Sequence, residues 1–306
     1  MSDDGRYIAF GSYIWDSQTR ATTLMGGSRR SNTPPYCDYY EAPLDEGYAV
    51  LTGDGQHGLY FLPPLHDSGW RMHVWNRSDG TSRLITDQPV TSSSITDDGS
   101  YVAYAPFEGI IDFLRDPTVV IRWNRSTGEH EVIAKAPEGK SVRSSRISGD
   151  GSTIYYEVGE DPQGPGPFEI FRWQDGQSEK IAQGSIHDVS DDGNTILLTT
   201  TDGLVLWSNG TLTVLAPRPA EGLINLARLS GDGRVVVWQR QESSDPDGPA
   251  AVYRKEVGKD AVQIISYPNG SRATAFALPE DGARLAYAER DDPTDEWAGG
   301  VGVFLR

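Results

Sequence analysis

The chain has 306 residues, of which 37% are hydrophobic, and its formal net charge is −17. This acidity excludes general nucleic-acid binding, which needs basic patches that displace counterions. The single cysteine, Cys37, excludes an internal disulfide, and no apolar run approaches the roughly 20 residues of a membrane-spanning helix. We therefore expect a soluble globular protein without membrane insertion. The cytoplasm is the favoured compartment, and removal of an upstream leader would imply a secreted or periplasmic one.

An Asp-Gly pair recurs along the chain, each time followed by an apolar run. The repeated glycines are Gly5, Gly55, Gly99, Gly151, Gly193, Gly233 and Gly282. Their spacings of 50, 44, 52, 42, 40 and 49 residues match the period of a four-stranded propeller blade. We predict that each Asp-Gly forms the tight turn between the innermost strand of a blade and the next one.

The remaining strands follow in the same order in every unit. In chain order, the second strands are predicted at 7–10, 58–62, 101–105, 153–157, 195–199, 235–239 and 284–288. The third strand carries an aromatic residue in one fixed slot, occupied by Trp15, Trp75, Trp123, Trp173, Trp207 and Tyr253. Recurrence at one repeat position predicts packing between blades and argues against an aromatic cofactor cage.

The sequence begins and ends inside a unit. Met1 already occupies the apolar slot four residues before the first glycine, and the last residues, 300–306, read as a third strand. We predict an all-β, seven-bladed propeller forming a single domain over residues 1–306, with incomplete first and last blades. The ring closes either with residues upstream of Met1 or with a three-stranded first blade, helped by segment 26–47. The alternative is six blades, with 19–25 as the closing outer strand and 1–18 as an appendage.

The repeat resembles a known family. The phrase Ser-x-Asp-Gly-x-Tyr-Ile-Ala-Phe at 2–10, and Trp-Asn-x-x-Thr-Gly at 123–128, are similar to the PD40 (TolB-like, WD40-like) propeller repeat of bacteria. That resemblance implies the fold and leaves the activity open, because relatives include TolB, oligogalacturonate lyases and the propeller domains of prolyl oligopeptidase-type peptidases. The sequence has no Gly-x-Ser-x-Gly nucleophile elbow, so a peptidase activity is not implied.

Nearly all of the variation in connection length falls on one predicted face of the propeller, which we expect to be the ligand face. Its longest loop, 26–47, offers arginines for anions and tyrosines for stacking, or alternatively forms a lid over the blade edge. A neighbouring loop adds a histidine and a tryptophan. The candidate ligand-binding residues of these loops are Arg29, Arg30, Tyr36, Tyr39, Tyr40, His66 and Trp70.

A second candidate site lies on the innermost strands. Arg146, Asp188 and Arg228 stand five residues before three successive repeat glycines, so neighbouring blades should bring them together. His187 lies beside them, and Arg143 and Asn225 stand nearer the ligand face. A histidine among charged groups at a channel mouth suits general base catalysis, whereas the structural alternative is a charge-paired channel wall.

Three functions remain open at this point. The first is a non-catalytic module that binds a small molecule, glycan, peptide or partner protein. The second is a lyase or cyclase with His187 or His66 as base and Arg146 or Arg228 as charge stabiliser; the third is a structural subunit. We expect no cofactor or metal, although one acidic turn could ligate calcium. Its residues are Asp291, Asp292, Asp295 and Glu296.

Overall fold

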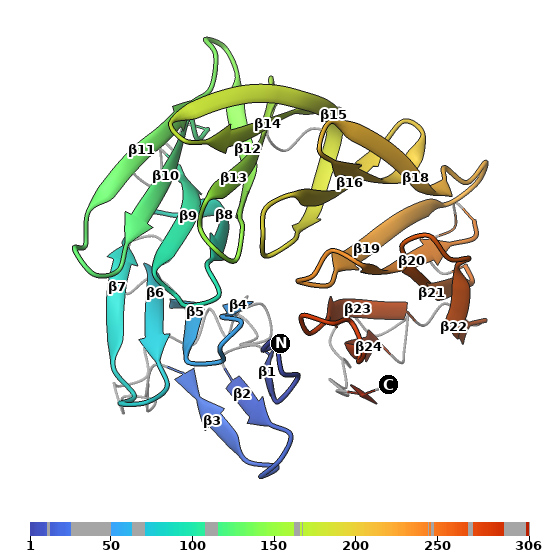
Figure 1. Ribbon diagram of the computed structural model, residues 1–306, viewed down its shortest axis with the longest axis horizontal. Helices are drawn as coiled ribbons and strands as arrows, with labels where there is room; N and C mark the ends of the chain where they lie inside the picture. The colour runs from blue at the N-terminus through green and yellow to red at the C-terminus, as the bar shows by residue number, and fades with distance from the viewer. Residues whose placement is uncertain are drawn as a thin grey trace, which may run out of the picture.

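The computed structural model describes residues 1–10, 13–25, 50–62, 71–107, 116–161, 166, 168–243, 245, 248–268, 272–290 and 304–305. Antiparallel sheets stand around a central axis in the described part, like the blades of a propeller (Figure 1). No helix in these ranges is long and apolar enough to cross a membrane. The prediction of an all-β propeller is confirmed.

Three-stranded sheets are formed by the first and the last described strands. The first comprises β1 (Tyr7–Phe10), β2 (Tyr13–Asp16) and β3 (Thr22–Leu24). The last comprises β23 (Arg272–Ala277), β24 (Ala286–Arg290) and β25 (Phe304–Leu305). In Figure 1 these two sheets are neighbours, so the beginning and the end of the chain lie on the same side of the ring.

Three four-stranded sheets lie between them, each with its strands in sequence order. One contains β4 (Val50–Leu51), β5 (His57–Leu62), β6 (Arg71–Asn76) and β7 (Ser82–Thr86). The next contains β8 (Val90–Ile95), β9 (Tyr101–Pro106), β10 (Val119–Asn124) and β11 (His130–Lys135). The third contains β19 (Leu223–Leu229), β20 (Val235–Gln241), β21 (Ala250–Glu256) and β22 (Val262–Tyr267).

A seven-stranded sheet spans two repeat units. It contains β12 (Ser141–Ile147), β13 (Thr153–Gly159), β14 (Phe168–Gln174), β15 (Gln177–Val189), β16 (Thr195–Thr200), β17 (Gly203–Ser208) and β18 (Thr211–Pro217). The 13-residue strand β15 pairs with β14 through its first half and with β16 through its second. It is thus both the outermost strand of one unit and the innermost strand of the next, a continuity that the sequence repeat did not reveal.

The seven Asp-Gly turns form a closed chain around the axis. Backbone N–H groups donate from Asp3 to Gly53, Asp54 to Asp97, Asp97 to Gly149, Asp150 to Asp191, Asp191 to Gly231, Asp232 to Glu280 and Glu280 to Asp3, at 2.8–3.3 Å. The last of these bonds links the seventh turn to the first. Backbone hydrogen bonds therefore run from turn to turn around the whole ring.

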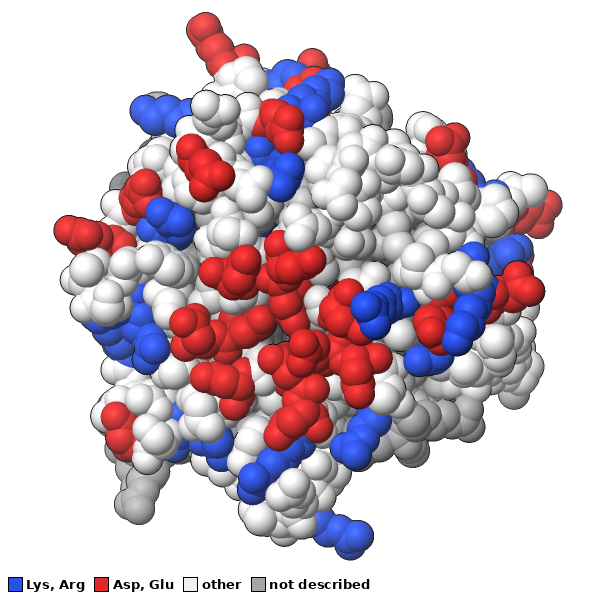
Figure 2. Space-filling view, in the orientation of Figure 1, with Lys and Arg blue, Asp and Glu red and all other residues white. Residues whose placement is uncertain are grey.

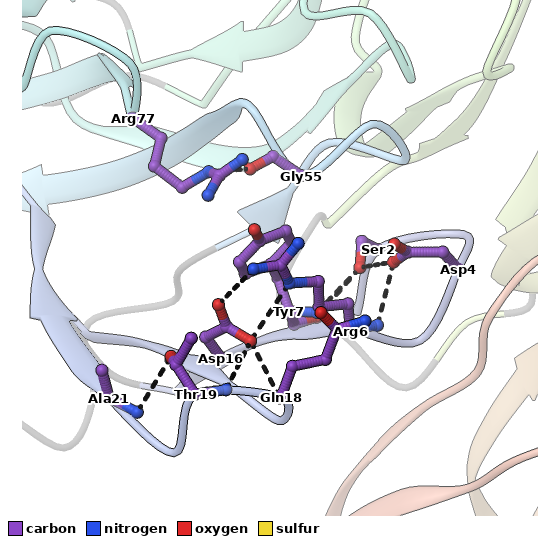
Figure 3. A network of polar contacts seen from close by, with 10 residues as sticks. All are labelled: Ser2, Asp4, Arg6, Tyr7, Asp16, Gln18, Thr19, Ala21, Gly55 and Arg77. Atoms are coloured by element: carbon purple, nitrogen blue, oxygen red, sulfur yellow. Dashed lines mark hydrogen bonds and ion pairs between the residues drawn. The ribbon is translucent and has the colours of Figure 1, made fainter.

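A recurring network of side-chain hydrogen bonds fixes the first six turns, each of which has Ser or Thr three residues before its glycine. Figure 3 shows the first one, in which the Ser2 hydroxyl donates to Asp4 at 2.6 Å and the Arg6 N–H donates to the same carboxylate at 2.9 Å. The N–H of Tyr7 donates back to Ser2 Oγ at 2.9 Å. Equivalent hydroxyl–Asp bonds recur in the next five turns. The Asp directly before each glycine is thereby explained as a turn residue.

The core lies between neighbouring sheets, as the repeated apolar slots predict. Trp75, Trp123, Trp173 and Trp207, all in the third-strand slot, are buried. Trp123 packs with Leu59, Met72 and Val102, which belong to two successive units. The recurrent tryptophans therefore join blades and do not line a cofactor site.

Candidate functional site

The candidate site is the central channel, a cavity of about 1060 Å³ lined by the innermost strands and the Asp-Gly turns. Its residues divide by charge along the axis. The turns contribute an acidic ring, which we define as Asp3, Asp97, Asp191 and Glu280. The strands that lead into the turns contribute an arginine cluster, defined as Arg143, Arg146 and Arg228, with His187 beside it.

Arg143 is the member of the arginine cluster that has an ion-pair partner. It lies on β12, and its Nη1 donates to Ser185 Oγ at 3.2 Å and to Glu157 Oε2 at 3.4 Å. Glu157 is only 2% exposed and also accepts the N–H of Ile186. Burial raises the pKa of Glu157, while these donors favour its charged form. The guanidinium lies 4.4 Å from the ring centre of Phe168, a cation–π contact that further fixes its place.

Arg146 and Arg228 are held differently, each by the backbone beside it. Nη1 of Arg146 donates to the Ser145 carbonyl at 3.0 Å, and Nη1 of Arg228 donates to the Ala227 carbonyl at 3.1 Å. Within the described ranges neither guanidinium has a carboxylate oxygen within 4.0 Å. The predicted charge-paired wall is therefore found at Arg143 but not at these two arginines.

Asp188 occupies the same repeat position as Arg146 and Arg228, in the unit between theirs, but its carboxylate accepts hydrogen bonds from backbone amides. Its Oδ2 accepts the N–H of Leu229 at 3.1 Å, which ties β15 to β19, and its Oδ1 accepts the N–H of Val189 at 3.2 Å. The carboxylate therefore helps to join two neighbouring innermost strands.

His187 is neutral at ordinary pH in this surrounding. Burial, followed by the positive charges of Arg228, Arg146 and Arg143, lowers its pKa to about 4. Nε2 of the imidazole lies 2.6 Å from Thr199 Oγ1. The positive charges of all three arginines thus act on this one imidazole.

The acidic ring occupies the turn end of the channel. Oxygens of Asp3, Asp97 and Asp191 lie within 4.8 Å of one another, close enough for one cation to bind all three carboxylates. Burial and then the neighbouring carboxylates raise the pKa of Asp97 to about 7 and that of Asp191 to about 8. Figure 2 shows acidic side chains gathered over the middle of this face of the molecule.

Alternating glycines make room for these carboxylates. The residue two before the repeat glycine alternates as Asp3, Gly53, Asp97, Gly149, Asp191, Gly231 and Glu280. A Cβ added to Gly53, Gly149 or Gly231 would lie 2.3, 1.8 or 2.0 Å from an Asp oxygen of the preceding turn. The three carboxylates therefore project into the channel over a neighbour that has no side chain.

The structure places the predicted channel residues as follows. Arg143, Arg146, His187, Asp188 and Arg228 all line the one cavity. Asn225 is not among the lining residues in the described part; it accepts Nε2 of Gln239 at 3.2 Å instead. Other candidates lie outside the described residues, namely Arg29, Arg30, Tyr36, Tyr39, Tyr40, His66, Trp70 and the acidic group Asp291, Asp292, Asp295 and Glu296.

Sequence reasoning missed the acidic ring and Glu157. The ring had a readable signal, because an acidic residue and glycine alternate at one repeat position while the aspartate that follows is the same in all seven units. Glu157 had no such signal. It ends the apolar run 153–157, and only the fold shows that its carboxylate turns back toward Arg143.

Comparison with known proteins supports the fold. No protein-family profile matches the sequence, and no curated protein matches it. Among solved structures, the β-propeller domain of the Trilobed protease from Pyrococcus furiosus has a TM-score of 0.65 at 14% identity, covering 96% of this chain and 86% of that one. An oligogalacturonate lyase in complex with manganese gives 0.62 at 13%, covering 80% and 71%. TolB from Acinetobacter baumannii gives 0.54 at 16%, covering 91% and 70%.

These likenesses define a propeller with a TolB-like or WD40-like arrangement, and no more than that. Propellers of this arrangement include lyases, peptidases and TolB, so the fold does not select an activity. The function has to be argued from the channel itself.

Proposed function

We propose that this protein is a non-catalytic binding propeller that takes a small molecule, or the end of a larger ligand, into its central channel at the arginine end. The observation that carries the proposal is the arginine cluster around one cavity, with two of its three guanidiniums lacking a carboxylate partner in the described residues. Concave sites with a few convergent polar groups on rigid strands are the usual form of a ligand pocket.

The position of the cluster supports the same conclusion. Arg143 lies near the start of β12, whereas the Asp-Gly turn follows its end. Arg143 therefore lies on the side of the channel away from the turns, whereas Arg146 and Arg228 stand one residue before the ends of β12 and β19. The sequence predicts the connections of variable length on the side of Arg143, and loops on a rigid scaffold commonly carry recognition. A ligand that enters from this face meets Arg143 first and then Arg146 and Arg228.

A cavity-blocking variant tests this proposal. Ser93 lines the channel on β8, so Ser93→Trp would fill part of it, and Thr213→Trp on the exposed outer strand β18 is the matched control. We would screen hexoses, uronic acids and dipeptides by thermal shift. Compounds that stabilise the parent protein should bind Thr213→Trp with the same apparent affinity. Their apparent affinity for Ser93→Trp should be at least tenfold lower. Equal stabilisation of both variants would contradict a channel site.

A second candidate function, a lyase with His187 as base, is favoured by one observation. The imidazole is neutral and stands among guanidiniums that could stabilise a developing negative charge. Within the described residues, the carboxylates able to share a cation are Asp3, Asp97 and Asp191 of the acidic ring, and this group does not include His187. Conversion of a stabilising compound of the same screen into product tests this function. If His187→Gln abolishes that turnover while binding is retained, the lyase hypothesis replaces the binding hypothesis.

A further inference from the structure

The arginine cluster has a geometry that narrows the ligand class, an inference that rests on the function proposed above. Arg146 lies on β12 and Arg228 on β19, and β15 contacts both of these strands between them. Burial and then the positive charge of Arg228 lower the pKa of Arg146, while Asp188 and Glu157 act in the opposite direction. Both arginines line the same partly buried cavity, where like charges repel.

The acidic groups nearest to the pair are already engaged. Asp188 accepts two backbone N–H groups, and Glu157 accepts the N–H of Ile186 and faces Arg143. Each of the two guanidiniums gives one hydrogen bond to a backbone carbonyl and has further N–H donors to offer. The protein has thus positioned two arginines without supplying the anion that would pair with them.

The charge balance of the cluster indicates what is missing. Three arginines contribute three positive charges, Asp188 and Glu157 at most two negative ones, and His187 is neutral. With both carboxylates ionised, one added negative charge makes the balance zero. A planar oxyanion matches the fork of guanidinium donors better than a spherical ion does.

We propose that the channel binds the carboxylate group of a small molecule between the guanidiniums of Arg146 and Arg228, with His187 as a neutral hydrogen-bonding neighbour. Arg143, held by Glu157, supplies the third positive charge on the side from which the ligand enters. A phosphate, which carries more charge than the cluster balances, should bind more weakly.

The test uses the full chain and the simplest carboxylate. Acetate is titrated while the arginine Nε–Hε resonances are followed by NMR, with the neutral isostere acetamide and inorganic phosphate as parallel probes. Resonances are assigned by their loss in Arg146→Gln and Arg228→Gln. Arg122→Gln is the matched control. Arg122 forms an ion pair with Glu131, with 2.7 Å between Nη2 and Oε2, and it does not line the channel.

We expect saturable shifts of the Arg146 and Arg228 resonances with acetate, none with acetamide, and at least tenfold weaker acetate binding in either channel variant but not in Arg122→Gln. Equal responses to acetate and acetamide, shifts that never saturate, or tighter binding of phosphate would overturn the carboxylate assignment. Failure of this inference can be distinguished from failure of the proposed function. If the screened compounds bind through the channel, as judged by Ser93→Trp, while acetate binding does not depend on Arg146 and Arg228, only the carboxylate inference is lost.

Discussion

Arg143 and Arg228 show how one residue type serves two purposes in the same cavity. Arg143 neutralises a carboxylate that is 2% exposed and packs over an aromatic ring. Arg228 has no such partner in the described residues and stands near the like charge of Arg146. The first is expected to contribute to folding, whereas the second is held in place at a cost, as is common for residues kept for binding.

Unfolding free energies should separate the two roles. Arg143→Gln leaves Glu157 without its cation and should lower the free energy of unfolding by about 1–2 kcal/mol, less than for a fully buried pair because Arg143 is 40% exposed. Arg228→Gln relieves repulsion and should leave stability unchanged or slightly higher. Urea unfolding at pH 7 measures both. A loss in Arg228→Gln as large as in Arg143→Gln would mean that Arg228 has a structural role.

At the scale of elements, the turns of neighbouring units fit together as pairs of acid and glycine. Gly149 takes an ordinary place in its turn, but a Cβ there would lie 1.8 Å from a carboxylate oxygen of Asp97. The Asp97 carboxylate thus fills the space that a side chain at position 149 would need. Such a pair can be tested by changing its members separately and together.

Gly149→Ala should lower the free energy of unfolding by about 1–3 kcal/mol, because overpacking forces the Asp97 side chain or the turn to move. In an Asp97→Ala background the same substitution should cost much less, so that the double-mutant cycle shows a clear coupling energy. Denaturant unfolding of the four proteins provides the measurement. Additive effects would show that the two residues do not compete for the same space.

The elements also show what the sequence could predict. The second strands were placed within about two residues, because an Asp-Gly turn followed by an apolar run is a strong local pattern. The predicted run 153–157 is the start of β13, Thr153–Gly159. The continuous β15 was not predicted, since its two halves belong to different repeats and Gly184, at their junction, reads like a break. The strand continues because that residue pairs in the sheet with Phe168.

At the scale of the whole molecule, the acidic ring makes the stability of the folded state depend on pH. The folded state raises the pKa of Asp97 and Asp191 to about 7 and 8, far above the value near 4 of an unfolded chain. An acid whose pKa is raised on folding holds its proton more tightly in the folded state. Unfolding therefore releases protons, and this contribution to stability is lost as the pH rises from about 4 to 8.

We expect the free energy of unfolding to fall by about 1–2 kcal/mol between pH 5 and pH 8, a figure reduced to allow for water in the channel. Asp191→Asn should flatten this dependence, and Ca²⁺ or Mg²⁺ at pH 8 should restore stability in the parent but not in the variant, since a bound cation can offset the negative charges of the three carboxylates. Thermal unfolding at both pH values measures the effects. A parent protein that is more stable at pH 8 than at pH 5 would contradict this account.

The site was harder to predict than the fold because it depends on residues that are far apart in the sequence. Strand patterns depend on neighbours in the sequence, whereas the acidic ring joins Asp3, Asp97 and Asp191, which are about a hundred residues apart. Arg146, Asp188 and Arg228 were found because they share one repeat position. Whether they pair with one another depended on Asp188 accepting backbone amides, which no repeat alignment reveals.

The shared strand β15 has a mechanical consequence for the channel. Because one continuous strand belongs to two of the seven repeat units, we expect these two units to move together as one stiff segment. His187 and the first two arginines are built on the stiff segment, while Arg228 is on β19, across the next joint. The turn bond from Asp191 to Gly231 and the Asp188 carboxylate already cross the joint between β15 and β19. A ligand held between Arg146 and Arg228 would add a further link across that joint, so we expect occupancy of the channel to stiffen it.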